Sequence, residues 1–334
     1  MTKRSVLRTR LLAPVGLLAA AGIITGVLSG HSGATGGGHP RLSDVAAALP
    51  APAAAVASPA PSAAAPTPTA TATPTAAPTA APTPTPTAAP SATPAPAPVA
   101  DAALRSAVAQ AGGALSVAVT DLTTGQSLDY GAPGHAFATA SIVKVDILAT
   151  LLLRSQDSGT ALTSDQQDLA AAMIENSDND SATALWNAIG QDAGLNAANR
   201  RFGLTATTGG TDGYWGLTST TAADQAQLLR QVFTGDSLLS AASRGYLQQL
   251  LDQVESDQRW GVSAAATGGT PAVKDGWLPR DADGLWVINS IGTVERGGHR
   301  LLIAVVSDGN AGESDGISLV QSVAQAAAAV LAGG

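Results

Sequence analysis

The sequence predicts an α+β fold, in which a five-stranded antiparallel sheet carries the terminal helices on one side and adjoins an α-helical lobe on the other. The order of elements is two strands, a block of helices, three strands and a closing helix. Turn residues join successive strands closely enough for antiparallel pairing. The part of the chain that can fold has roughly 230 residues, which fits one core.

The first two strands form a hairpin. Leu115–Asp121 alternates apolar and small residues, Thr124-Gly125 provides a turn, and Ser127–Gly131 follows. The helical block comes next, with Thr163 as an N-cap and Gln166 at the capping-box spacing. The predicted helices are 141–153, 163–174, 180–189, 196–202, 221–232 and 240–254.

Three strands and one helix complete the domain. Ala272–Trp277, Leu285–Val294 and Arg300–Asp308 are the predicted strands. A segment rich in Pro, Asp and Gly separates the first two, and Gly297-Gly298 makes the second turn tight. An Ala-rich helix over Ile317–Leu331 closes the chain.

Residues 1–40 are interpreted as an export segment. A basic head contains four cationic residues before Leu11, and Leu11–Gly30 carries no charge. Twenty such residues are just long enough to span a bilayer, so both a cleaved signal peptide and a membrane anchor remain open. The basic head predicts that the rest of the chain lies outside the cytoplasmic membrane, secreted or anchored to its outer face.

Residues 41–100 are predicted to form a disordered linker, rich in Pro, Ala and Thr. No charged residue occurs from 51 to 100, and large apolar side chains are almost absent. Such a stretch cannot offset the entropy of ordering, and its Pro content favours extended conformations. The folded domain is therefore assigned to residues 101–334.

The composition of this domain excludes several classes of function. It carries 12 basic and 24 acidic residues, which argues against nucleic acid as a partner. The chain has no cysteine, so disulfides, thiolate zinc sites and a lipid-modified N-terminal cysteine are excluded. The pattern offers no metal or cofactor site, and we expect a monomer.

The first candidate catalytic residues are Ser141 and Lys144. They lie three positions apart at the start of a predicted helix, so both side chains share one face. A serine hydroxyl becomes a nucleophile when a base removes its proton, and a neutral lysine is such a base. A capping serine beside a solvated lysine is the alternative explanation of the same pattern.

The use of lysine favours the catalytic interpretation. The chain has 14 arginines and three lysines, and only Lys144 and Lys274 lie in the predicted domain. Arginine serves wherever a fixed positive charge is enough, but it cannot lose its proton in a protein. A lysine retained on the otherwise apolar strand Ala272–Trp277 indicates a cleft.

Two further motifs accompany Ser141. Ser177-Asp178-Asn179 falls in a turn between helices, where Ser177 could pass a proton to a leaving nitrogen and Asn179 could hold a substrate amide. Asp178 would brace the loop. Gly276, which follows Lys274 and Asp275, would allow a substrate backbone to approach the strand.

The ordered motifs Ser-x-x-Lys, Ser-Asp-Asn and Lys-x-Gly resemble those of the serine β-lactamase and penicillin-binding protein superfamily, most closely class A β-lactamases. The resemblance extends from Leu104 to about Leu331. It implies acyl transfer from a β-lactam or a cell-wall peptide to Ser141, with Lys144, Ser177 and Lys274 as catalytic partners. Asn179, Asp275, Gly276 and Trp277 would bind substrate, and the backbone N–H groups of Ser141 and Trp277 would form the oxyanion hole.

The sequence departs from the family pattern in two ways. Class A enzymes carry a glutamate on a loop after the Ser-Asp-Asn motif, and no glutamate lies here between Glu175 and Glu255. Asp212 is the one carboxylate on the corresponding loop, Thr205–Thr221, and is the candidate to substitute for this glutamate in activating the deacylating water. Asp275 replaces the usual Thr or Ser, and an aspartate facing the cleft would repel a β-lactam carboxylate.

Other sites and other roles were weighed. Gly235-Asp236-Ser237-Leu238 matches an esterase signature but falls between helices, and a Ser-His-Asp triad has only His135 and His299 to draw on. Trp215 and Trp277 are the tryptophans expected in a cleft. The alternative to an enzyme is a penicilloyl-sensing or cell-wall-binding protein with slow or no turnover, which the missing glutamate favours.

Overall fold

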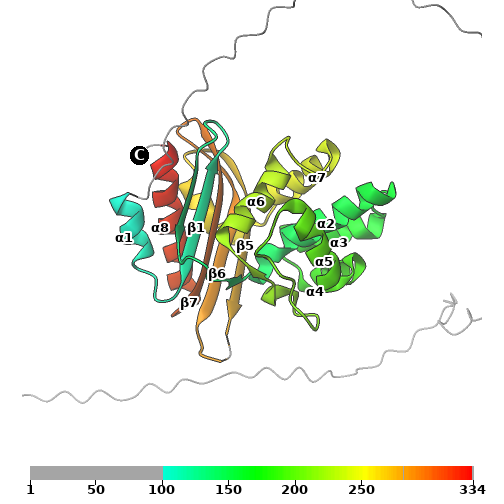
Figure 1. Cartoon of the computed structure of the whole chain (residues 1–334), viewed down its shortest axis with the longest axis horizontal. Helices are drawn as coiled ribbons and strands as arrows, with labels where there is room; N and C mark the ends of the chain where they lie inside the picture. The colour runs from blue at the N-terminus through cyan, green and yellow to red at the C-terminus, as the bar shows by residue number, and fades with distance from the viewer. Residues whose placement is uncertain (1–100, 281, 333–334) are drawn as a thin grey trace, which may run out of the picture. The chain divides into compact units, whose positions relative to one another are not determined.

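A computed structural model describes residues 101–280 and 282–332 (Figure 1). The export segment and the linker predicted for residues 1–100 lie outside the described residues, so both remain predictions. Within the described residues, the predicted α+β architecture is confirmed. The order of strands in the main sheet is β2-β1-β7-β6-β5, and every neighbouring pair is antiparallel.

The sheet contains the five strands that the sequence predicts, with longer C-terminal strands than expected. A second, two-stranded sheet joins two short strands that were not predicted. The main strands are β1 (Leu115–Asp121), β2 (Ser127–Gly131), β5 (Gly268–Pro279), β6 (Trp286–Arg296) and β7 (His299–Asn310), and the short ones are β3 (Phe137–Ala138) and β4 (Ser219–Thr220).

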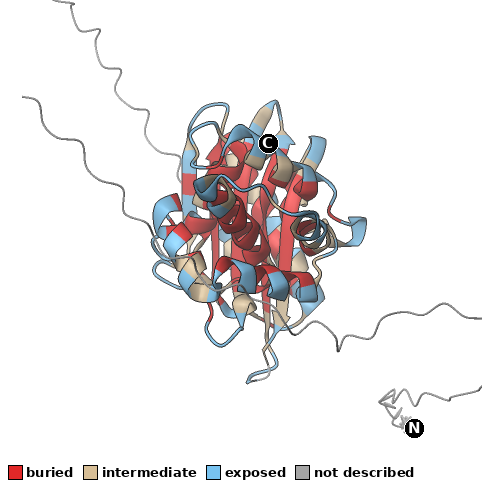
Figure 2. Ribbon diagram, turned by 90° about the vertical axis from the view of Figure 1, so that its right-hand side faces the viewer, coloured by how far each residue is buried: buried red, intermediate tan, exposed pale blue. Residues whose placement is uncertain are grey.

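Two hydrophobic clusters cover the two faces of the sheet. On β1, Val117 and Val119 join one cluster while Ala118 joins the other, as the alternation of a strand requires. The first face packs against α1 (Ala102–Val108) and α8 (Glu313–Ala332), which lie together on one side in Figure 1. The second face packs against the helical lobe. Figure 2 shows buried residues concentrated along the central strands.

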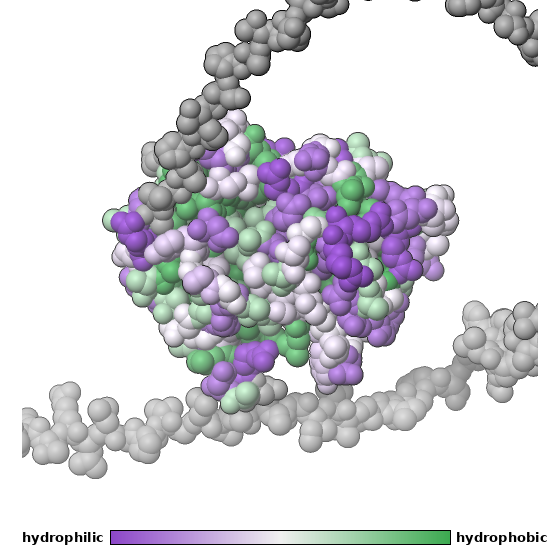
Figure 3. All heavy atoms as spheres, in the orientation of Figure 1, coloured by the Kyte–Doolittle hydropathy of each residue, from purple (hydrophilic) through white to green (hydrophobic). Residues whose placement is uncertain are grey.

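The helical lobe supplies the other side of the fold. The predicted capping box at the start of α3 (Ser164–Glu175) is confirmed: Thr163 Oγ1 accepts from Gln166 N, and Gln166 Oε1 accepts from Thr163 N. Figure 3 shows hydrophilic residues gathered over this lobe. Its helices are α2 (Val143–Ser158), α3 (Ser164–Glu175), α4 (Asn179–Ile189), α5 (Gln191–Phe202), α6 (Ala222–Phe233) and α7 (Ala241–Asp252).

Helix α5 begins five residues earlier than predicted. Gly190 and Gln191 both adopt left-handed conformations, with φ of 89° and 56°, so the chain turns sharply between α4 and α5. Gly194 then packs so closely that a Cβ there would lie 1.8 Å from Ile189 O. The start of this helix was not predicted because it contains two glycines in a polar stretch, where helix propensity and apolar periodicity are both weak.

Helix α8 is long and apolar enough to cross a membrane by length and composition. Its Val320, Val323 and Ala324 are buried against the sheet, together with residues of β1 and β7. These contacts are those of a core helix in a globular domain.

Candidate active site

Ser141 lies at a strained turn between β3 and α2. The single turn of 3-10 helix η1 (Ala140–Ile142) precedes α2, and Ala140 adopts a φ of 48°. A left-handed conformation is costly for a residue with a Cβ, so surrounding contacts must enforce it. The turn places Ser141 in the wall of a pocket, at the start of a mostly buried helix.

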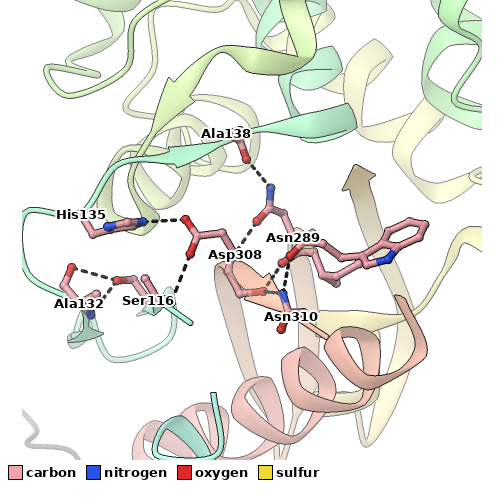
Figure 4. Close-up of polar contacts among 11 residues, drawn as sticks. Ser116, Ala132, His135, Ala138, Asn289, Asp308 and Asn310 are labelled. Carbon is pink, nitrogen blue, oxygen red and sulfur yellow. Dashed lines mark hydrogen bonds and ion pairs between the residues drawn. The ribbon is translucent and has the colours of Figure 1, made fainter. Parts of the chain in front are cut away.

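Asn289, a residue of the sheet, holds this turn by hydrogen bonds. Asn289, on β6, is fully buried and donates from Nδ2 to Ala138 O and to Thr139 O, both at 2.9 Å (Figure 4). Its Oδ1 accepts from Ser307 N of β7 at 3.0 Å. Asn289 was not singled out from the sequence, although a polar side chain inside an apolar strand was a usable signal.

Gly276 makes the close approach possible. A Cβ at this position would lie 2.7 Å from Ser141 N and 2.9 Å from Ile142 N. The absent side chain therefore admits the backbone of the turn at Ser141. The approach of a substrate backbone to Gly276 stays a prediction. This packing places Gly276 beside Ser141, at the candidate site.

Lys144 is fully buried, and its amine lies among oxygen atoms. Nζ is 3.0 Å from Ser141 Oγ, 2.6 Å from Ser177 O, 3.0 Å from Ser177 Oγ and 2.8 Å from Asn179 Oδ1. A neutral amine can donate to the Ser177 carbonyl and to Asn179 while its lone pair accepts the Ser141 proton. This is the geometry that a general base for Ser141 requires.

Ser177 links the two lysines. Its Oγ is 3.0 Å from Lys144 Nζ and 3.0 Å from Lys274 Nζ, which reaches the turn from β5. Ser177 adopts a φ of 56°, and Asp178 stabilises the turn by accepting from Ser181 N at 2.7 Å. Asp178 thus braces the loop, and the sequence-predicted residues 141, 144, 177, 179 and 274 lie together.

Burial controls the charge of both lysines. The pKa of Lys144 is lowered to about 7, mainly by burial and also by the Lys274 ammonium, while the Asp178 carboxylate opposes these two effects. Burial also lowers the pKa of Lys274, against the attraction of Asp275. A lysine with a pKa near neutrality has a large neutral fraction, as a base for serine must have.

Asp275 does not face the pocket, contrary to the orientation considered from the sequence. Its side chain is fully buried, and Oδ2 accepts from Trp260 N at 2.9 Å. Alternation along β5 explains this placement, since Lys274 and Asp275 point to opposite faces of the sheet. Burial raises the pKa of the Asp275 carboxyl. Direct repulsion of a substrate carboxylate therefore has no structural basis.

A pocket of about 600 Å³ opens beside Ser141. Asn179, Trp215 and Trp277 line it with Ser141, and Arg280 carries the only charge among the described lining residues. β5 is an edge strand, so alternate backbone groups near Trp277 have no partner strand. The two tryptophans expected in a cleft thus line the same pocket.

Asp212 immediately precedes Gly213, which lines this pocket. The Asp212 side chain is exposed, and its only described polar contact is with Thr211 Oγ1 at 3.2 Å. It does not line the pocket, although Tyr214 and Trp215 of the same loop do.

The other candidate sites are occupied by structural contacts. Ser237 donates to Gln231 O at 2.6 Å in the turn after α6. His135 lies 2.7 Å from Asp308 (Figure 4), and His299 lies 2.8 Å from Asp121. Neither histidine lines the pocket of Ser141. Within residues 101–280 and 282–332, no cluster of His, Cys, Asp or Glu has the arrangement of a metal site.

A family model described as "Beta-lactamase enzyme family" matches residues 153–331, more than half of the chain. The chain belongs to this family. The matched segment contains Ser177 and Lys274 but begins after Ser141 and Lys144, so those two residues are supported by their geometry.

Solved structures agree with the fold, and curated proteins match part of the sequence. PenP of Rhodopseudomonas palustris, named as a class A β-lactamase, is 23% identical with a TM-score of 0.60 and covers 69% of this chain and 100% of its own. A β-lactamase of Xanthomonas campestris is 21% identical, with a TM-score of 0.57, over 67% of this chain and 94% of its own. The protein LppW of Mycobacterium tuberculosis, named as a lipoprotein, is 29% identical over 175 residues, 50% of this chain. The chain spans about half the length of the curated relatives it matches, 55%.

The charge of Lys274 should be visible in the pH dependence of acylation. If neutral Lys144 is the base for Ser141, the acylation rate is expected to rise with pH and to level off above about 7. Lys274→Met removes a charge that lowers the pKa of Lys144, so the inflection should move to higher pH. Lys274→Arg retains the charge and serves as the control. Stopped-flow rates with a chromogenic cephalosporin measure this, and equal inflections in all three proteins would contradict the electrostatic coupling.

Proposed function

We propose that this protein is an exported serine hydrolase that transfers the acyl group of a β-lactam or of a peptidoglycan-type amide to Ser141. The observation that carries the proposal is the amine of Lys144, buried and 3.0 Å from Ser141 Oγ. Membership of the β-lactamase family supports the same chemistry.

In the proposed mechanism, neutral Lys144 accepts the Ser141 proton while Oγ attacks the substrate carbonyl. The backbone N–H groups of Ser141 and Trp277 stabilise the oxyanion. Asn179 holds its Oδ1 toward Lys144, which leaves its N–H₂ for a substrate carbonyl. Ser177, which contacts both lysines, carries a proton to the leaving nitrogen, and Lys274 keeps the site positive for a substrate carboxylate.

The second candidate function is a penicillin-binding or penicilloyl-sensing protein that turns over slowly or not at all. It is favoured by one observation: no carboxylate is found among the described residues that line the pocket. A water that hydrolyses the acyl-enzyme therefore has no carboxylate base, and loss of a general base typically slows a step about 100-fold or more.

We also propose that the domain works outside the cytoplasmic membrane, secreted or anchored to its outer face through Leu11–Gly30. The similarity to LppW supports an extracytoplasmic location. This chain has no cysteine, so it cannot carry a lipid on an N-terminal cysteine.

Intact-mass analysis after mixing the protein with benzylpenicillin tests the proposal and separates its two forms. We expect the mass to increase by one penicilloyl group and the adduct to persist for many minutes. A brief adduct with accumulating penicilloic acid would make the protein a β-lactamase. Absence of any adduct with penicillins, cephalosporins and acyl-D-alanine thioesters would contradict acyl transfer.

A further inference from the structure

The indole of Trp215 lies over the amine of Lys144. The distance from Lys144 Nζ to the ring centroid is 4.9 Å, and the ring also lines the pocket of Ser141. Trp215 opens the short 3-10 helix η2 (Trp215–Leu217), in the loop where the sequence lacks the family glutamate. An aromatic ring thus occupies the side of Lys144 that the loop covers.

Hydrogen bonds fix the ring in this position. Trp215 Nε1 donates to Thr183 Oγ1 at 3.1 Å, and Thr183 Oγ1 in turn donates to Asn179 O at 2.9 Å on helix α4. The loop itself is tied to the turn before Ser141, since Thr139 N donates to Thr218 O at 2.8 Å. The β3–β4 pairing holds the same two segments together. These bonds describe a fixed cover over the amine.

The cover leaves little space for water beside Lys144. Its amine contacts Ser141, Ser177 and Asn179 on the other sides and is fully buried. An acyl group on Ser141 Oγ would place its ester carbon in the pocket, next to the ring. A water that attacked this ester with Lys144 as base would need the volume that the ring fills.

We propose that Trp215 covers Lys144 against small molecules from solvent and, by excluding water from the ester, sets the lifetime of the acyl-enzyme. The second part rests on the proposed acylation of Ser141; the first part does not. Removing the ring should therefore have two separate effects, on access to the amine and on loss of the acyl group.

Access to the amine is measured with cyanate. The lysine nitrogen adds to the carbon of isocyanic acid and one amine proton moves to the reagent nitrogen, which gives a carbamylated lysine. Peptide mapping is simple because the chain has three lysines. In Trp215→Ala, we expect carbamylation of Lys144 to be about tenfold faster or more than in the wild type. Lys274 is equally buried but is not covered by the ring, so its rate is the internal control.

Loss of the acyl group is measured by intact mass after a penicillin pulse, with and without hydroxylamine. Hydroxylamine attacks the ester carbonyl, the bond to Ser141 Oγ breaks, and the hydroxylamine proton returns to Oγ, which leaves a penicilloyl hydroxamate. In Trp215→Ala, deacylation should be about tenfold faster and should rise with hydroxylamine concentration. Trp215→Phe retains a ring and should remain within about threefold of the wild type.

The two measurements separate failure of this inference from failure of the proposed function. If Trp215→Ala folds by circular dichroism and its Lys144 reacts with cyanate at the wild-type rate, the cover does not exist. If the amine becomes reactive but deacylation is unchanged, Trp215 does not set the lifetime of the acyl-enzyme. If the wild type forms no acyl-enzyme, the proposed function fails, and cyanate alone decides whether Trp215 covers Lys144.

Discussion

Ser141→Ala is expected to abolish acylation by a fluorescent penicillin while the fold remains intact. Without Oγ there is no atom to form the ester, whereas the alanine fits the same turn and keeps the N–H at the start of the helix. The neighbouring Lys144 remains in contact with Ser177 and Asn179, so its burial is not left uncompensated. Circular dichroism and thermal unfolding provide the check on folding.

Matched variants distinguish the nucleophile from its partners. Lys144→Arg places a cation that cannot lose its proton beside Ser141, so acylation should fall by about a hundredfold or more. Ser177→Ala removes the proton carrier but not the nucleophile, and slow labelling should persist. If Ser141→Ala is labelled as fast as the wild type, another residue is the nucleophile and the assignment of the site is wrong.

The candidate serine and the two lysines of the site could be predicted from the sequence, because spacing and residue type carry their signal. The spacing of Ser141 and Lys144 predicted the contact between them, and the scarcity of lysine pointed to Lys274. The strand that bears Lys274 was also predicted from its apolar pattern. In the structure, Ser177 Oγ contacts the amines of both Lys144 and Lys274. No local sequence pattern could have predicted these distances.

What the sequence could not provide is the direction from which distant segments approach. The side chain of Asp275 was considered as part of the cleft, but alternation along β5 places it under the Trp260 segment. Gly276 admits the helix of Ser141. Asn289, on β6, donates to two carbonyl oxygens of the turn before Ser141. Its polar side chain inside an apolar strand signals a buried hydrogen bond, but the sequence does not say which segment accepts it.

The second large effect is expected in stability, at Asp146 on helix α2. Asp146 is buried in the helical lobe, where its Oδ2 accepts from Asn199 Nδ2 at 2.9 Å and its Oδ1 has no partner. The pKa of Asp146 is raised to about 7, mainly by burial and also by the Asp224 carboxylate, while the hydrogen bond from Asn199 opposes these two effects. Unpartnered oxygens of Thr150 and Asn199 are buried as well, and Asn199 is a neighbour of Asp146.

Asp146→Asn is therefore expected to remove a destabilisation that grows with pH. Between the ordinary aspartate pKa, about 4, and the folded value, about 7, the folded protein keeps a proton that the unfolded chain has released, so the free energy of unfolding falls as pH rises. The contribution is fully present below about pH 4 and is lost as pH rises through 7, a change on the order of 4 kcal/mol at about 1.4 kcal/mol per pKa unit. The asparagine variant lacks this loss, so its free energy of unfolding should exceed that of the wild type by little at pH 4 and by most above pH 7.

Urea unfolding at pH 4, 6 and 8 measures the difference, with the exposed Asp236→Asn as the control that should follow the wild type. A difference between Asp146→Asn and the wild type that stays constant across this range would mean that Asp146 binds no extra proton in the folded state.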